Sequence, residues 1–128
     1  MAIRVVRLGS PREKGEGLRV GTVRRPPRGV PKSEYASRDL YDVWLPNLAP
    51  SESLIKVAQG AKDDRAWRSF ERRYRAEMSR PDARHVLELL AALSRTCNFS
   101  VGCYCADERR CHRSVLRTLL KESGATMA

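Results

Sequence analysis

The order of strand-like and helix-like segments constrains this chain most. Residues 3–8 and 18–23 are short β-branched runs, and a third strand-like run at 98–105 comes only after three segments with helical spacing. Strands that are joined by long helical connections pair in parallel, because a tight turn can join only antiparallel neighbours. A last helical segment begins near residue 112. We therefore predict an α/β fold with a small, largely parallel sheet of three or four strands flanked by helices, in the order strand, strand, helices, strand, helix.

Capping residues and apolar spacing mark the three central helices. Ser51 is a typical N-cap for a short helix to about residue 59, and Asp63 or Asp64 for a longer helix to about residue 79. Pro81 suits the first turn of a third helix, which ends near residue 95. The longer helix has an apolar side chain at every third or fourth position, which predicts one buried face: Trp67, Phe70, Tyr74 and Met78.

Two proline-containing segments are predicted to be irregular. The segment that follows the second strand has three prolines within six residues, at 26, 27 and 31, which excludes both helix and sheet pairing. It contains Arg24, Arg25 and Arg28, and we call residues 24–29 the arginine loop. Residues 40–48 hold an apolar run that is followed by Pro50 and interrupted by Pro46. There we expect turns with at most one helical turn.

The chain length fits one domain. A chain of 128 residues is predicted to fold as one domain, 1–128, with an ordered core at about 3–122, and can bury a core without disulfides or metal. No run of 18 apolar residues is present, and the first residues lack the pattern of a signal peptide. We therefore expect a cytoplasmic protein that does not bind membranes.

The charge balance predicts an anionic partner. The 25 basic residues outnumber the 15 acidic ones, and residues 1–35 alone carry nine basic and three acidic side chains. Twenty of the basic residues are arginine, whose planar fork binds phosphate or carboxylate with two hydrogen bonds. A small anionic molecule and a nucleic acid both fit this balance. The alternative is that many of these arginines only solvate helix surfaces.

Residues 103–113 hold an unusual density of reactive side chains. Three of the four cysteines, one of the two histidines and three arginines fall within these eleven residues. We call residues 105–113 the cysteine loop. It runs from a predicted strand end to a predicted helix start, which is where open α/β sheets bind ligands. In a parallel sheet the arginine loop leaves at the same edge, so we expect the two loops to form one pocket.

The leading hypothesis is noncovalent binding of a phosphorylated or other anionic ligand in this pocket. Arg24, Arg28 and Arg113 are the predicted ligand-binding residues, because each lies at a predicted strand end or helix start. A nucleic acid bound across the basic surface is a further alternative. Aromatic residues are not interleaved with the basic ones, so base stacking is not indicated.

A thiol-dependent enzyme is the main alternative. Cys105 or Cys111 would act as nucleophile or redox thiol, with His112 as base or ion-pair partner and Asp107 as an orienting acid. A metal site is a weaker alternative, since the pattern C-x-C-x5-C-H lacks the C-x2-C spacing of zinc knuckles. We assign no metal ligand and no cofactor. The last alternative is a solvated loop with only structural roles.

Several short motifs resemble one known family. The segment from Cys105 to Arg113, with Asp107, Cys111 and His112, resembles the C-x-E-x(n)-C-H-R segment of the domain of unknown function 488 family. Three further stretches look like its small YeaO-like branch: Arg19–Gly29, Trp44–Ser51 and Phe70–Glu77. The resemblance spans about residues 3–122. It implies a compact α/β domain, and it implies no established biochemical activity.

Overall fold

The computed structural model, which describes residues 1–105 and 107–128, has one four-stranded sheet in which every pairing is parallel. The strands lie in the order β1-β4-β2-β3. Their bounds are Ile3–Arg7 for β1, Leu18–Gly21 for β2, Val43–Trp44 for β3 and Phe99–Cys103 for β4. All five residues of β4 are buried, as expected of a strand with a neighbour on each side. The predicted α/β class and the parallel sheet are confirmed.

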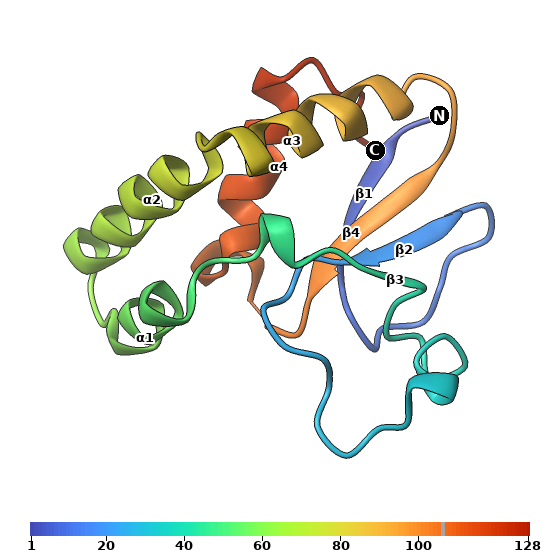
Figure 1. Cartoon of the computed structure of the whole chain (residues 1–128), viewed down its shortest axis with the longest axis horizontal. Coiled ribbons are helices and arrows are strands. Elements are labelled where there is room, and N and C mark those ends of the chain that lie inside the picture. Colours follow the sequence, from blue (N-terminus) through green and yellow to red (C-terminus); the bar gives the residue numbers. More distant parts are fainter. Residues whose placement is uncertain (106) are drawn as a thin grey trace.

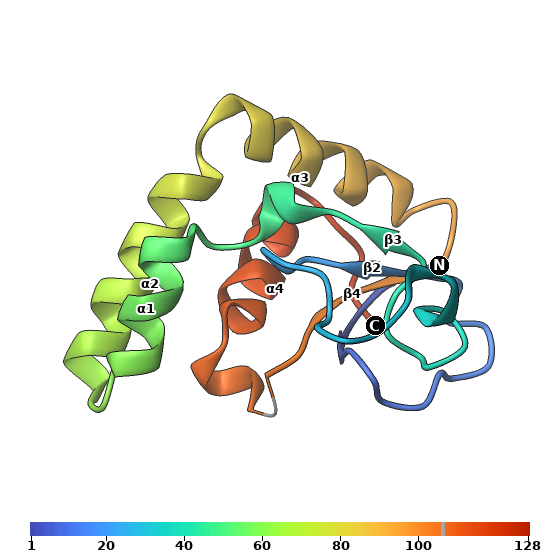
Figure 2. The same ribbon diagram turned by 60° about the horizontal axis from the view of Figure 1, so that its bottom comes forward.

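Four helices gather beside the sheet, and their bounds follow the predicted caps (Figure 1). Ser51 accepts a hydrogen bond from the Leu54 amide at the start of α1, and Asp63 accepts one from Ala66 at the start of α2. Figure 2 shows α1 and α2 side by side, with α3 crossing above the sheet. The helices are α1 Glu52–Gly60, α2 Asp64–Met78, α3 Pro81–Leu93 and α4 His112–Glu122, and short 3-10 turns span Lys32–Glu34, Pro46–Leu48 and Glu108–Arg110.

The core forms where α2 meets α4 and the sheet. The predicted apolar face of α2 is buried in full, and Tyr74 also donates its hydroxyl to the carbonyl of Leu48 at 2.7 Å. Leu116 and Leu120 of α4 are fully buried in the same cluster. Burying such side chains stabilises the fold by about 1.5–3 kcal/mol each. No described helix is long and apolar enough to cross a membrane.

The prediction for residues 40–48 is incomplete, because a short edge strand lies among the expected turns. Val43 and Trp44 form β3 beside Val20 and Gly21 of β2, and the one expected helical turn follows at Pro46–Leu48. Pro46 ends the strand after two residues, which is too short for an alternating pattern to show in the sequence. Of the two aromatic residues in this run, Tyr41 is buried and Trp44 is 43 % exposed.

A second, smaller cluster of buried side chains lies at the carboxyl ends of the strands. It contains Leu8, Val23 and Tyr41 together with the sulfur-bearing side chains of Cys103 and Cys111. Leu8 follows β1, and Cys103 is the last residue of β4, the strand beside it. The Leu8 amide donates to the Cys103 carbonyl at 2.8 Å. This cluster supports the edge of the sheet where the arginine and cysteine loops begin.

Candidate functional site

A pocket of about 520 Å³ opens at the carboxyl edge of the sheet. The arginine loop, the cysteine loop and α1 form its walls. The structure thus brings Arg24 and Arg28 together with Cys105 and His112 around one cavity. The lining residues are Val23, Arg24, Arg25, Arg28, Pro50, Glu52, Ile55, Lys56, Gln59, Cys103, Tyr104, Cys105 and His112.

The basic side chains of the pocket differ in how they are held. Arg24 is half-buried, and its guanidinium donates to the carbonyls of Ala49 at 3.0 Å and Pro50 at 3.1 Å, which fix it without neutralising it. Arg25 forms an ion pair with Glu52. Arg28 is exposed and, among the described residues, makes no hydrogen bond or ion pair.

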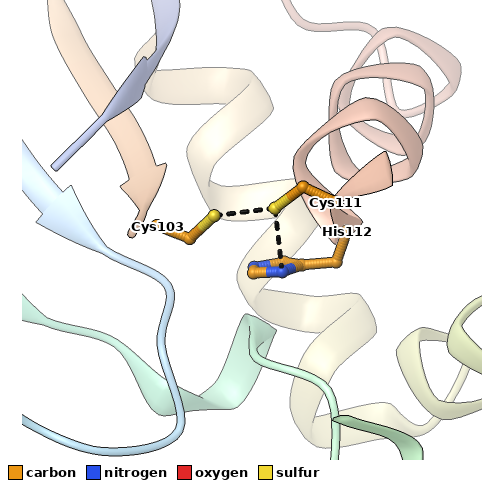
Figure 3. Close-up of side chains that lie close together, drawn as sticks. All are labelled: Cys103, Cys111 and His112. Carbon is orange, nitrogen blue, oxygen red and sulfur yellow. Dashed lines mark hydrogen bonds between the residues drawn. The ribbon is translucent and has the colours of Figure 1, made fainter. Parts of the chain in front are cut away.

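Two thiols and an imidazole meet where β4 ends and α4 begins (Figure 3). The sulfur atoms of Cys103 and Cys111 lie 2.7 Å apart, and the Cys111 sulfur lies 3.7 Å from Nδ1 of His112. Cys103 and His112 line the pocket, whereas Cys111, which is 3 % exposed, lies behind its wall. Of the two cysteines proposed as nucleophiles, only Cys105 faces the cavity.

The tautomer of His112 follows from its hydrogen bonds. Its Nε2 lies 2.8 Å from the carbonyl oxygen of Thr22, which can only accept, and 3.3 Å from the Thr22 hydroxyl, which itself donates to Gly102. Nε2 must therefore carry the proton. Burial lowers the pKa of His112 to about 4, so the ring is neutral at pH 7 and Nδ1 presents a lone pair toward Cys111.

Arg113 is an ionised side chain inside the protein. It is 3 % exposed, donates to the carbonyl of Cys105 at 2.6 Å, and pairs with no carboxylate of the described residues. It does not line the pocket, in contrast to Arg24 and Arg28. The neighbouring thiols of Cys103 and Cys111 lower the pKa of the exposed Cys105 thiol, and the positive charge of Arg113 lowers it further.

Asp107 lies outside the pocket lining. Its carboxylate caps a short turn by accepting from the Arg109 backbone amide at 3.0 Å and from the Arg109 side chain at 3.3 Å. The group that orients His112 is instead the main-chain carbonyl of Thr22. A backbone carbonyl carries no sequence signal, so no motif could have identified it.

The first helix contributes site residues that the sequence analysis missed. Glu52, Ile55, Lys56 and Gln59 of α1 all line the cavity. The N-cap at Ser51 predicts this helix, but the face that it turns toward the two loops depends on how it packs against α2, which a capping residue does not encode. The spacing of three and four residues between the lining positions is the only local signal, and it is common to many amphipathic helices.

Comparison with known proteins agrees with the motifs in these loops. A family model described as "DUF488-N3a: Active DUF488-N3 subclade" matches residues 3–124, which include both the arginine loop and the cysteine loop. The match does not address the YeaO-like branch. No curated protein and no solved structure matches the chain. Because the matched model covers nearly the whole sequence, the chain belongs to the DUF488 family.

Proposed function

We propose that the pocket binds a small phosphorylated or otherwise anionic ligand. The observation that carries this proposal is the charge of the cavity wall. Among the described residues, four basic side chains line the cavity, and Glu52 is the one carboxylate that does so. That carboxylate is occupied by Arg25, so the charges of Arg24 and Arg28 have no partner among the described residues that line the cavity.

The hydrogen bonds of Arg24 favour a bound anion. Its guanidinium is held by two main-chain carbonyls, so little side-chain entropy is lost when it meets a ligand. Arg28 can donate two coplanar hydrogen bonds to the same anion, a geometry that suits phosphate oxygens. Glu52 and His112, the first residues of α1 and α4, both line the cavity, so two helix N-termini lie beside it. Helix N-termini favour negative charge.

The cavity has room for more than a bare ion. Pockets of about 300–1,000 Å³ hold small molecules, and this one falls in that range. Val23, Ile55 and the ring of Tyr104 supply apolar wall beside the basic side chains. An organic phosphate would place its charged group on the arginines and its uncharged part against these side chains.

Calorimetric titration with inorganic phosphate and with AMP tests the proposal. Arg28→Ala removes charge-assisted hydrogen bonds worth about 2 kcal/mol, which corresponds to a Kd roughly 30-fold higher. Arg84→Ala is the matched control, since Arg84 is exposed on α3 and lies outside the cavity lining. Its Kd should stay within about twofold of the original value.

Two results would count against the anion pocket. Equal weakening by Arg28→Ala and Arg84→Ala would show that net charge alone attracts the anion. Binding to duplex DNA with a steep salt dependence, unaffected by AMP, would favour the nucleic-acid alternative.

A thiol-dependent enzyme is the second candidate, because Cys105 shares the cavity with the arginines. An electrophilic centre on a ligand held by Arg24 and Arg28 would lie beside its sulfur. Cys105→Ser should leave phosphate binding within about twofold while abolishing any turnover, whereas turnover that survives this substitution would exclude Cys105 as the nucleophile. Cys97→Ser, at an exposed thiol outside the cavity lining, is the matched control.

A further inference from the structure

Three atoms that commonly ligate soft metals meet at the wall of the pocket. The sulfurs of Cys103 and Cys111 and a ring nitrogen of His112 all lie within 4.8 Å of one another. All three residues are buried, with exposed fractions of 2, 3 and 7 %. Figure 3 shows the three side chains converging from the end of β4 and the start of α4. The fold brings Cys103 to the adjacent pair Cys111–His112, which sequence spacing does not show.

The orientation of His112 is the one that metal-binding histidines adopt. Such residues usually donate the N–H of one ring nitrogen to a carboxylate or backbone carbonyl, which leaves the other nitrogen free to bind the metal. Here Nε2–H is donated to the Thr22 carbonyl, and the lone pair of Nδ1 faces the sulfurs. Among the described residues, the hydrogen-bonding partner of Nδ1 is the Cys111 sulfur, at 3.7 Å.

We propose that Cys103, Cys111 and His112 form a binding site for a thiophilic divalent metal ion, with Zn²⁺ as the favoured occupant. Two thiolates and an imidazole are ligands that zinc prefers, and the two negative charges of the thiolates would balance the double positive charge of the ion. Cys103 and His112 also line the cavity, so the fourth coordination position faces it. Zinc ions with three protein ligands keep such a position open for water or a bound molecule.

Binding requires a small movement of the two thiols. They now lie 2.7 Å apart, whereas two sulfurs at about 2.3 Å from a tetrahedral zinc ion are roughly 3.7 Å apart. The side chains must therefore separate by about 1 Å. Oxidation of the pair to a disulfide would remove both ligands, so the site requires reducing conditions.

Titration of the reduced, metal-free protein with Co²⁺ tests the site directly. We expect one equivalent to produce sulfur-to-cobalt charge-transfer absorption together with the visible bands of tetrahedral Co²⁺, and one equivalent of Zn²⁺ to abolish both. Cys103→Ser and Cys111→Ser should each weaken Co²⁺ binding more than tenfold, as measured by competition with a chelator. Cys97→Ser, which changes an exposed thiol outside the cluster, should bind as the original protein does.

A second measurement needs no substitution. Zn²⁺ should protect Cys103 and Cys111 of the original protein from alkylation in mild denaturant, while Cys97 reacts at its former rate. The proposal would be overturned if Co²⁺ produced no such absorption, or if the absorption survived in folded Cys103→Ser and Cys111→Ser. Equal protection of Cys97 from alkylation would also overturn it. Neither experiment contains phosphate or AMP, so a negative result here does not bear on the proposed anion pocket, which has its own test.

Discussion

Glu16→Gln should destabilise the protein by about 3 kcal/mol at pH 7. The carboxylate of Glu16, which is 2 % exposed, accepts from Arg19 at 2.8 and 3.0 Å and from Ser100 at 2.8 Å. The fully buried Arg19 also holds the carbonyls of Ser10 and Asp39, both at 2.7 Å. The substitution would leave the buried Arg19 charge without the carboxylate that pairs with it.

Two arguments lead to this magnitude. Hydrogen bonding from Arg19 lowers the pKa of Glu16 from 4.5 to about 2, and at about 1.4 kcal/mol per pKa unit this corresponds to about 3 kcal/mol. Removing one partner of a buried ion pair costs about 3–5 kcal/mol in other proteins. Because the pKa is lower in the folded state, the stabilisation is present above pH 4.5 and is lost as the pH falls toward 2.

Urea unfolding followed by circular dichroism at several pH values from 7 to 3 measures this effect. The difference in the free energy of unfolding between the original protein and Glu16→Gln should shrink below pH 4.5. Glu13→Gln is the control, since the Glu13 side chain is 71 % exposed in its ion pair with Arg4 and should cost at most about 1 kcal/mol. A loss below 1 kcal/mol for Glu16→Gln, or a difference that does not change with pH, would refute the reasoning.

Two further substitutions test the packing near the site, both by urea unfolding. Tyr74→Phe leaves the buried carbonyl of Leu48 without its donor and should cost about 1–2 kcal/mol; a neutral effect would mean that another group satisfies that carbonyl. Gly21→Ala should cost about 1–3 kcal/mol, because the new Cβ would lie 2.4 Å from the ring of Tyr41; unchanged stability would show that this ring moves aside freely.

Sequence patterns predicted the helices because each carries its own local signals. The apolar face of α2 is visible at spacings of three and four, and caps such as Ser51 and Asp63 mark where helices begin. The edge strand at Val43–Trp44 has no such pattern, since two residues cannot show an alternation. It exists because the backbone of β2 offers free hydrogen-bonding groups beside it.

The site was predictable only in outline. The parallel sheet implies that the arginine and cysteine loops lie at one edge, and both line the observed cavity. Whether a particular arginine faces that cavity depends on packing: Arg28 is exposed there, whereas Arg113 and Arg19 are buried. The meeting of Cys103 and Cys111 likewise depends on how the intervening loop closes, which no spacing rule encodes.

The central claim is that an anion binds between the arginine loop and the cysteine loop. Crystals soaked in tungstate, a phosphate analogue whose heavy atom scatters anomalously, test the location of that anion. We predict the strongest anomalous peak inside the cavity, within hydrogen-bonding distance of the guanidinium groups of Arg24 and Arg28. Tungstate found only on exposed arginines elsewhere, with the cavity free of it, would contradict the account.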